Sequence, residues 1–403
     1  MIHANPIRLE GAGHPMYQLD LDEFLEEVVE AELGKPAILA LLRDSERLAR
    51  RLAEKLKRLA EDLEALRGVR EEARPIPRGL GSESCVAIDS TFPPEGGLEL
   101  VGGQLVGIVA GYLSYKSRVN GVKPRGANGR LVFLPSDEPY SRISVYAKLL
   151  EKRLTLRILR LIGEGRIESR VVMLDGEVVP YRLLFGRPRN GLLEKLDELS
   201  SRVLEEARRL GVTIIGVVKR SYSRILSVPA GRLLSFNDKL VAAVMLSRGE
   251  YLPVGSFNDL LPAYAAMLDE ERGGSLTAVV SERLAERPVY GEVRVALYKP
   301  SRPTPYGQAV RVEVFNGDVE EVVSVLDRLT NTATGFPLPV DLIDEYVRFE
   351  ARGLDLVRRK LLGRLAGLAG DAGIVRLLLG HTNPEKRYLY EWRGLRAPRP
   401  HRP

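Results

Sequence analysis

The sequence contains little cysteine and few aromatic residues. Among 403 residues there is one cysteine and one tryptophan, and aromatic residues make up 6% of the chain. The single cysteine, Cys85, cannot form a disulfide within the chain, and no second cysteine or cluster of histidines lies beside it to complete a zinc site. We therefore interpret Cys85 as a packing residue and expect the chain to fold by burial of apolar side chains alone.

Long hydrophobic runs are also missing. No stretch of about 18 uninterrupted apolar residues occurs, and the first residues, MIHANPIRLEGAGH, lack the three regions of a signal peptide. These absences predict a cytoplasmic protein. No GxxxxGK[ST] pattern is present, so a Walker-type phosphate-binding loop is unsupported, and nothing in the sequence resembles an organic cofactor site.

Charged residues, by contrast, are abundant and of both signs. The chain has 60 Lys and Arg against 54 Asp and Glu, which gives a formal net charge of +6. Heavy use of arginine with few Cys, Met or Trp residues is typical of many thermophile proteins. The mild basic surplus permits a polyanionic partner without requiring one.

The pattern of apolar residues divides the chain into five parts. Amphipathic periodicity predicts two N-terminal helices that form a hairpin, separated by a Lys-Pro pair. Strands then alternate with helices, which indicates an α/β core, and two alternating strands around a Pro-rich loop predict an antiparallel pair. The expected parts are a helical region at 1–80, the first part of the core at 81–235, a mostly helical insertion at 236–285, the completion of the core with antiparallel strands and late helices at 286–380, and a tail at 381–403.

Two of the predicted strands lead into an aspartate. Asp89 follows the apolar residues of VAIDS, and Asp175 follows those of VVMLDG. Burying an unpaired ionised carboxylate costs several kcal/mol, so such strands usually deliver the carboxylate to a metal, a proton or a helix cap. A haloacid dehalogenase nucleophile would need a second aspartate two places after Asp89, where Thr91 stands. The sequence therefore favours a metal site over that type of phosphatase.

A site for Mg²⁺ or Mn²⁺ needs further oxygen ligands from other elements. Two such ions about 4 Å apart can activate water and stabilise the leaving oxygen in phosphodiester cleavage. Glu151 lies in the helix between the two strands, where its plainer interpretation is a solvated partner for a Lys or Arg. Asp344 lies in PLPVDLIDEYVRF, where its plainer interpretation is a charge favoured by the helix dipole.

The order of these features resembles the NurA nuclease family of archaeal DNA-end processing. The resemblance extends from about Cys85 to about Leu361, and it rests on VAIDS, VMLDG, VVKRS, the strands containing VALYKPS and VRVEV, and GFPLPVDLIDEYVRF. That family is similar in fold to ribonuclease H. The resemblance thus implies an α/β fold in which a ribonuclease H-like mixed sheet is flanked by helices, with an N-terminal helical hairpin and a helical insertion.

Carried onto this chain, the resemblance implies a Mn²⁺ site, with Mg²⁺ as an alternative ion. Its ligands would be Asp89, Glu151, Asp175 and Asp344, with Glu164 as the alternative to Glu151. Many relatives carry a histidine where Asp344 stands, and an aspartate is a harder ligand that also suits Mn²⁺.

The resemblance also implies contacts with DNA phosphates. Lys219 in VVKRS would contact the scissile phosphate or a neighbouring one, whereas its plainer interpretation is a lysine in water at the end of a strand. Arg220 and Arg224 would add salt-dependent phosphate contacts.

We therefore expect a Mn²⁺-dependent deoxyribonuclease that acts on single strands and, from 5′ to 3′, on duplex ends. The resemblance further implies a homodimer and a HerA-type hexameric ATPase that pumps DNA toward the nuclease during end resection for homologous recombination. A non-catalytic DNA-binding or adaptor subunit of that motor complex is the main alternative, and an Argonaute-like nuclease ranks third because the chain shows no separate guide-end domains. The nuclease hypothesis requires the side chains of Asp89 and Asp175 to approach within roughly 4 to 8 Å.

Overall fold

The computed structural model describes residues 36–93, 98–100, 103–116, 122–135, 139, 141–186, 191–304 and 307–348, with scattered positions between 356 and 368. The chain divides into two compact units, residues 1–61 and 62–403. The described part of the first unit belongs to helix α2 (Pro36–Ala65), which is the second helix of the expected hairpin. The first helix of that hairpin and the tail at 381–403 lie outside the described residues.

One ten-stranded sheet forms the framework of the second unit. Its strand order is β1-β8-β9-β10-β7-β6-β2-β4-β3, and β5 pairs with β4. The strands are β1 (Arg74–Pro75), β2 (Cys85–Thr91), β3 (Leu98–Leu100), β4 (Gly103–Tyr115), β5 (Val122–Pro135), β6 (Val171–Asp175), β7 (Thr213–Val218), β8 (Glu250–Ser256), β9 (Arg294–Lys299) and β10 (Val310–Phe315).

The sheet is mixed. Strands β4 and β5 form a long antiparallel hairpin beside β2, whereas β2, β6 and β7 run parallel to one another. Parallel neighbours need a crossover, and helices α4 (Ser141–Gly163) and α6 (Gly191–Leu210) provide it. The expected antiparallel pair near the end of the core is present as β9 and β10, with Val310 opposite Tyr298.

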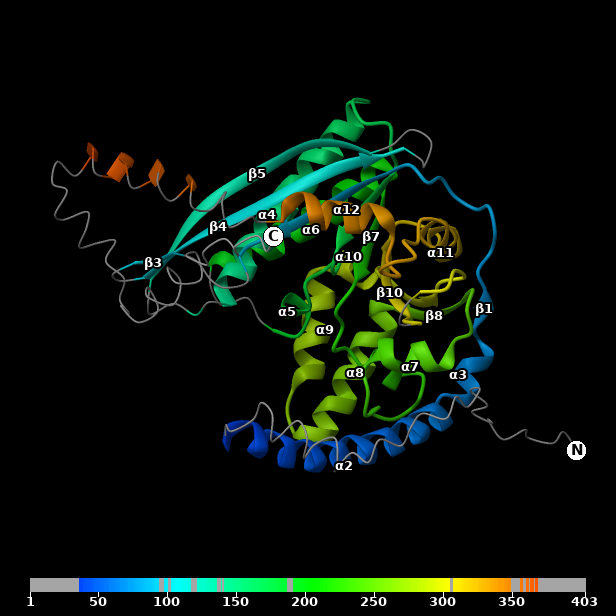
Figure 1. Cartoon of the computed structure of the whole chain (residues 1–403). Coiled ribbons are helices and arrows are strands. Elements are labelled where there is room, and N and C mark those ends of the chain that lie inside the picture. The colour runs from blue at the N-terminus through cyan, green and yellow to red at the C-terminus, as the bar shows by residue number, and fades with distance from the viewer. Residues whose placement is uncertain are drawn as a thin grey trace, which may run out of the picture. The chain divides into compact units, whose positions relative to one another are not determined.

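Helices cover both faces of the sheet (Figure 1). Apolar side chains of α4 and α6 pack on the face that carries Val86 and Ile88 of β2. Helices α11 (Val319–Arg328) and α12 (Leu338–Val347) pack on the opposite face, which carries Cys85 and Ala87. Because successive side chains of a strand point to opposite faces, this arrangement buries the first five residues of β2, whereas Ser90 and Thr91 at its end are half-buried.

The segment 236–285 was expected to be mostly helical, and it also contains a strand. Helix α7 (Asp238–Met245), helix α8 (Phe257–Arg272) and most of helix α9 (Leu276–Glu286) are helical as expected, but β8 pairs with β9 and extends the sheet. The sequence of β8, EYLPVGS, has no alternating apolar pattern, and its pairing register shifts between Pro253 and Gly255. Proline and glycine at such an irregularity hide the strand from sequence analysis.

The remaining described elements are short: α3 (Arg67–Glu71), α5 (Tyr181–Leu184), the 3₁₀ segment η1 (Ile225–Ser227) and α10 (Pro288–Gly291). Among the described residues, no helix has both the length and the apolar character needed to cross a membrane.

Candidate metal centre

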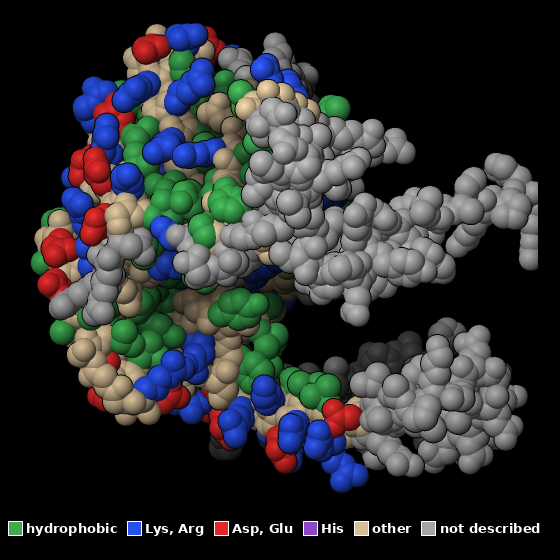
Figure 2. All heavy atoms as spheres, turned by 90° about the vertical axis from the view of Figure 1, so that its left-hand side faces the viewer, with side chains coloured by type: hydrophobic (Ala, Val, Ile, Leu, Met, Phe, Trp, Pro, Cys, Tyr) green, Lys and Arg blue, Asp and Glu red, His purple; other side chains and the backbone are tan. Residues whose placement is uncertain are grey.

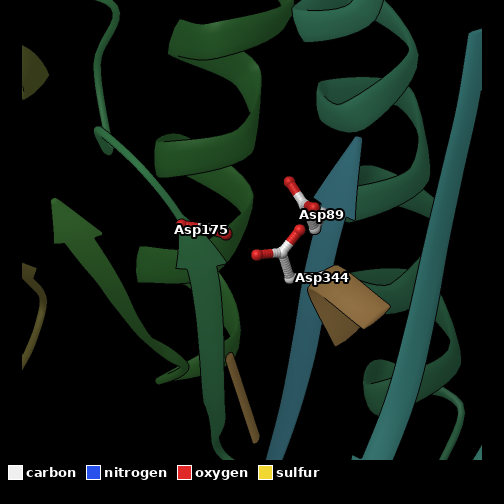
Figure 3. A group of neighbouring side chains, drawn as sticks. All are labelled: Asp89, Asp175 and Asp344. Carbon is white, nitrogen blue, oxygen red and sulfur yellow. The ribbon is translucent and has the colours of Figure 1, made fainter. Parts of the chain in front are cut away.

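Three aspartates from separate elements converge at one edge of the sheet. Asp89 lies near the end of β2, Asp175 is the last residue of β6, and Asp344 belongs to α12. One carboxylate oxygen from each lies within 4.8 Å of the other two, which falls within the range expected from the sequence for Asp89 and Asp175. Figure 3 shows the three side chains pointing toward one another.

The strand register explains why two of these carboxylates meet. Strands β2 and β6 are parallel neighbours, and Ile88 is in register with Leu174, so the following residues, Asp89 and Asp175, reach the same edge together. Alternation places both aspartates on the face that also carries Ala87 and Met173. That face is the one covered by α12.

Helix α12 adds the third carboxylate. Its Ile343 packs into the apolar cluster on the sheet, and the neighbouring Asp344 faces the two strand aspartates. Asp341, in the first turn of α12, accepts hydrogen bonds from Asn331 and Thr334 and so holds the turn that leads into the helix. The first-turn charge that the helix dipole favours is thus Asp341, which leaves Asp344 for the cluster.

Burial and mutual repulsion disfavour the ionised forms of these carboxyl groups. Asp89 is 7% exposed, and its pKa is raised to about 8, first by burial and then by the charges of Asp175 and Glu151. Burial also raises the pKa of Asp175, which Lys219 partly opposes. Such a group of carboxylates is stable as a set of anions only when cations face it.

Lys219 is the first of these cations. Its Nζ lies 2.8 Å from Asp175 Oδ2, 3.1 Å from Asp344 Oδ2 and 3.8 Å from Asp341 Oδ1. Burial disfavours the ammonium, but Asp175 and Asp344 outweigh that cost, so the pKa of Lys219 is raised. The plain interpretation of Lys219 as a lysine in water does not match this position.

Glu151 lies close by but on the other side of β2. It is fully buried on α4, and its Oε2 accepts hydrogen bonds from Lys148 Nζ at 2.8 Å and Ser90 Oγ at 3.1 Å. Its Oε1 has no hydrogen-bond partner among the described residues and lies 3.6 Å from Lys152 Nζ. Glu151 is therefore not a solvated ion pair, and it is not one of the three converging carboxylates either.

Glu164, the alternative to Glu151, lies elsewhere. It is exposed at the end of α4, roughly 20 Å along the helix from Glu151, and pairs with Arg166 at 3.4 Å. Of the two glutamates, Glu151 is the one whose charge reaches Asp89.

The two arginines expected to contact phosphates differ in their surroundings. Arg220 follows Lys219 and is exposed. Arg224 donates a hydrogen bond to the carbonyl oxygen of Leu234 at 2.8 Å and lies 3.9 Å from Glu271, so it supports the loop after β7.

A buried charge network behind the site was missed by sequence analysis. Arg311 on β10 is fully buried and pairs with Asp238 at 3.3 Å and Glu313 at 3.2 Å. Glu313 in turn accepts a hydrogen bond from the backbone N–H of Val178, in the segment that follows Asp175. Two charged residues inside the otherwise apolar strand VRVEVF were the available signal for this network.

Basic side chains also line a depression outside the acidic cluster. Its volume is about 250 Å³, and Arg130, Arg153 and Lys195 surround an apolar lining that includes Ile108 and Leu150. All three basic side chains are exposed. Figure 2 shows a face of the molecule on which Lys and Arg side chains are spread among apolar and acidic ones. The surface thus offers positive charge to a polyanion away from the aspartates.

A family model and several solved structures point to the NurA family. The model of the NurA domain family matches residues 102–349. The structure of the NurA nuclease from Sulfolobus solfataricus is 17% identical, with a TM-score of 0.57, and the match covers 83% of this chain and 98% of that chain. The search of curated proteins finds no match.

Two further structures are similar at lower scores. A NurA structure bound to dAMP and manganese is 14% identical with a TM-score of 0.47, over 76% of this chain and 94% of that chain. Endonuclease V from Bacillus subtilis is 12% identical with a TM-score of 0.34, over 73% and 90% of the two chains. The ribonuclease H-like mixed sheet flanked by helices, expected from the sequence, is confirmed.

Proposed function

Because the chain belongs to the NurA family, we propose that it is a Mn²⁺-dependent deoxyribonuclease, for which Mg²⁺ is an alternative ion. The observation that carries this proposal is the convergence of Asp89, Asp175 and Asp344 within 4.8 Å at the edge of a mixed sheet. The manganese in a similar NurA structure supports the choice of ion.

The residues present fit a divalent cation. Carboxylate oxygens are the hard ligands that Mn²⁺ and Mg²⁺ prefer, and the cluster offers three of them from elements that the core holds in place. Glu151 Oε1 is a buried carboxyl oxygen without a hydrogen-bond donor among the described residues, which makes Glu151 the candidate fourth ligand. When bound, two such ions supply a water nucleophile and stabilise the leaving oxygen of a phosphodiester.

Lys219 has a defined part in this proposal. In the absence of metal its ammonium offsets the charges of Asp175 and Asp344. If those carboxylates held a divalent cation, Lys219 would no longer be needed to offset their charge, and its N–H donors could contact a phosphate oxygen of the bound strand. Arg220 is exposed next to it and adds a further phosphate contact, whereas Arg224 contributes less because it supports the loop after β7.

The finer assignments follow from the family resemblance. We propose that the protein cleaves single strands and, from 5′ to 3′, duplex ends, that it acts as a homodimer, and that it resects DNA ends for homologous recombination with a HerA-type hexameric ATPase. The proposed location is the cytoplasm.

The proposal is tested by cleavage of labelled single-stranded and duplex DNA in Mn²⁺. Asp89→Asn and Asp175→Asn should each reduce the rate by at least about 100-fold, because each removes a ligand whose charge binds the ion. Glu198→Gln is the matched control, since Glu198 is exposed on α6 and its ion pair with Arg202 is long, at 3.7 Å.

Two outcomes would contradict the proposal. Full activity in either aspartate variant would remove the mechanism. Wild-type protein that binds DNA but cleaves neither substrate in Mn²⁺ or Mg²⁺ would instead favour the adaptor subunit.

A further inference from the structure

A second lysine lies at the acidic cluster and has no role in the function proposed so far. Lys148 is on α4, one helical turn before Glu151, and its Nζ donates a hydrogen bond to Glu151 Oε2 at 2.8 Å. Its charge also favours the ionised forms of Asp89 and Asp175, whose pKa values it lowers. The ammonium of Lys148 therefore acts on Asp175, as Lys219 does, and also on Asp89, but it comes from the α4 side of the sheet.

Glycine at position 176 makes room for this ammonium. Gly176 directly follows Asp175 and has a φ of 123°, a conformation that favours glycine. A Cβ added there would lie 3.2 Å from Lys148 Nζ, closer than an ordinary contact. The backbone just after β6 therefore lies against Lys148, directly beside Asp175, a proposed metal ligand.

The donors of Lys148 are only partly used. An ammonium has three N–H donors, and among the described residues the only hydrogen bond of Lys148 is the one to Glu151. Its side chain is 28% exposed, so Lys148 is not sealed within the core.

Lys152, one turn further along α4, shows the contrasting case. It is fully buried and donates a hydrogen bond to the carbonyl oxygen of Val178 at 3.0 Å. Of the two lysines beside Glu151, Lys152 is fully buried and Lys148 is partly exposed.

A phosphate that reaches metal ions at the three aspartates must enter a region rich in carboxylates. Lys219 already contacts Asp175 and Asp344, so a second positive group with unused donors offsets the repulsion of the incoming strand. We propose that Lys148 is a phosphate-binding residue of this site, whose unused N–H donors contact a phosphate of the bound DNA strand while the remaining one holds Glu151. This proposal rests on the nuclease function proposed above.

The test measures how DNA binding depends on salt. Each phosphate contact to a single strand contributes about 0.7 to the slope of log Kd against log salt concentration. Binding of a fluorescent oligothymidylate is followed by anisotropy over a NaCl series, with Ca²⁺ in place of Mn²⁺ and the strand checked by gel for integrity. For Lys148→Met we expect the slope to fall by about 0.7, and for Lys148→Arg we expect the wild-type slope.

Two further variants make the result specific. Lys148→Gln keeps an N–H donor for Glu151 while removing the charge, so it should reproduce the lower slope even if Lys148→Met folds poorly. Lys116→Met is the matched control. Lys116 pairs with Glu168, and its neighbour Tyr115 lies opposite Cys85, at the end of β2 that is far from Asp89. Its slope should equal that of the wild type.

The outcomes separate this inference from the function on which it rests. Two results would overturn the role of Lys148 while leaving the nuclease function intact. One is a wild-type salt slope in Lys148→Gln, and the other is a fall of the slope in Lys116→Met as large as that in Lys148→Met. Failure of the wild-type protein to bind the strand at all would count against the nuclease function itself.

Discussion

Gly111 lies directly opposite Asp89 in the antiparallel pairing of β2 with β4. A Cβ at Gly111 would lie 2.6 Å from Val347 Cγ1 and 3.2 Å from the ring of Tyr346, both on α12. The missing side chain therefore lets α12 approach the strand pair that carries Asp89. Because α12 also carries Asp344, this close approach sets how near the third carboxylate comes to the other two.

Substitution of Gly111 should disturb the proposed metal site more than the fold. Gly111→Ala forces α12 outward, which displaces Asp344, and overpacking of this kind costs typically about 1–3 kcal/mol of stability. We expect weaker Mn²⁺ binding by calorimetry together with a modest loss in denaturant unfolding. Gly129→Ala on β5 is the control, since its Cβ would have no contact closer than 3.8 Å. Unchanged Mn²⁺ affinity in Gly111→Ala would show that α12 does not depend on this contact.

The raised pKa of Asp89 predicts a pH dependence of metal binding. With a pKa of about 8, Asp89 is protonated at neutral pH in the metal-free protein. Since a ligand must be deprotonated to bind a cation, Mn²⁺ affinity should rise as the pH increases toward and through about 8. Calorimetric titrations across this range measure the effect, and Asp89→Asn should remove most of the slope. A flat profile in the wild type would contradict the raised pKa.

The same shift has a consequence for stability. A carboxyl whose pKa is higher in the folded state binds a proton that the unfolded chain has already released, so the metal-free protein should lose stability as the pH rises from about 4 to about 8. Burial also raises the pKa values of Glu313 and Asp238 to about 7, so these groups contribute to the pH dependence of stability as well. Comparing the thermal unfolding of the wild type with that of Asp89→Asn across this pH range isolates the contribution of Asp89. Equal pH profiles for the two proteins would be inconsistent with it.

Removal of Lys219 should separate metal binding from cleavage. Lys219→Met deletes a positive charge 2.8 Å from Asp175, so Mn²⁺ should bind more tightly to the free protein. Cleavage should nevertheless fall by at least about tenfold, because the proposed phosphate contact is lost. Lys116→Met is the control for loss of charge, because Lys116 is exposed and pairs with Glu168. Weaker Mn²⁺ binding in Lys219→Met would contradict the proposed competition.

The buried pair of Arg311 and Glu313 predicts a large effect on stability. Arg311→Met leaves Glu313 and Asp238 buried without their cation, which costs about 3–5 kcal/mol in unfolding free energy. The double variant with Glu313→Gln should recover part of this loss. Arg67→Met breaks only an exposed pair with Glu64 and should cost less than about 1 kcal/mol. Chemical denaturation measures all three.

Much of the core can be predicted from local sequence patterns. The apolar runs before Asp89 and Asp175 are strands, and the amphipathic run from Ser141 forms α4 as expected. These elements are readable because their apolar periodicity is strong and their ends carry turn residues. The strand β8 was not foreseen, because a proline and a glycine replace the alternation that marks a strand.

The arrangement around Glu151 depends on contacts between distant parts of the chain. The helix pattern alone does not say whether Glu151 points to water or to β2, and the structure pairs it with Lys148 and with Ser90, whose side chain lies on the opposite face of β2 from Asp89. Likewise, nothing in the local sequence of β4 indicates that Gly111 lies opposite Asp89.

The sequence by itself determined which strands end in a carboxylate, because hydrophobic burial and strand length are properties of a few consecutive residues. Only the tertiary structure decided that Asp344 joins Asp89 and Asp175, that Lys219 and Lys148 face them, and that Glu151 approaches from the other face. Strand register and helix placement are set by packing between residues far apart in the chain, so the position of each charge relative to the others appears only in the folded protein.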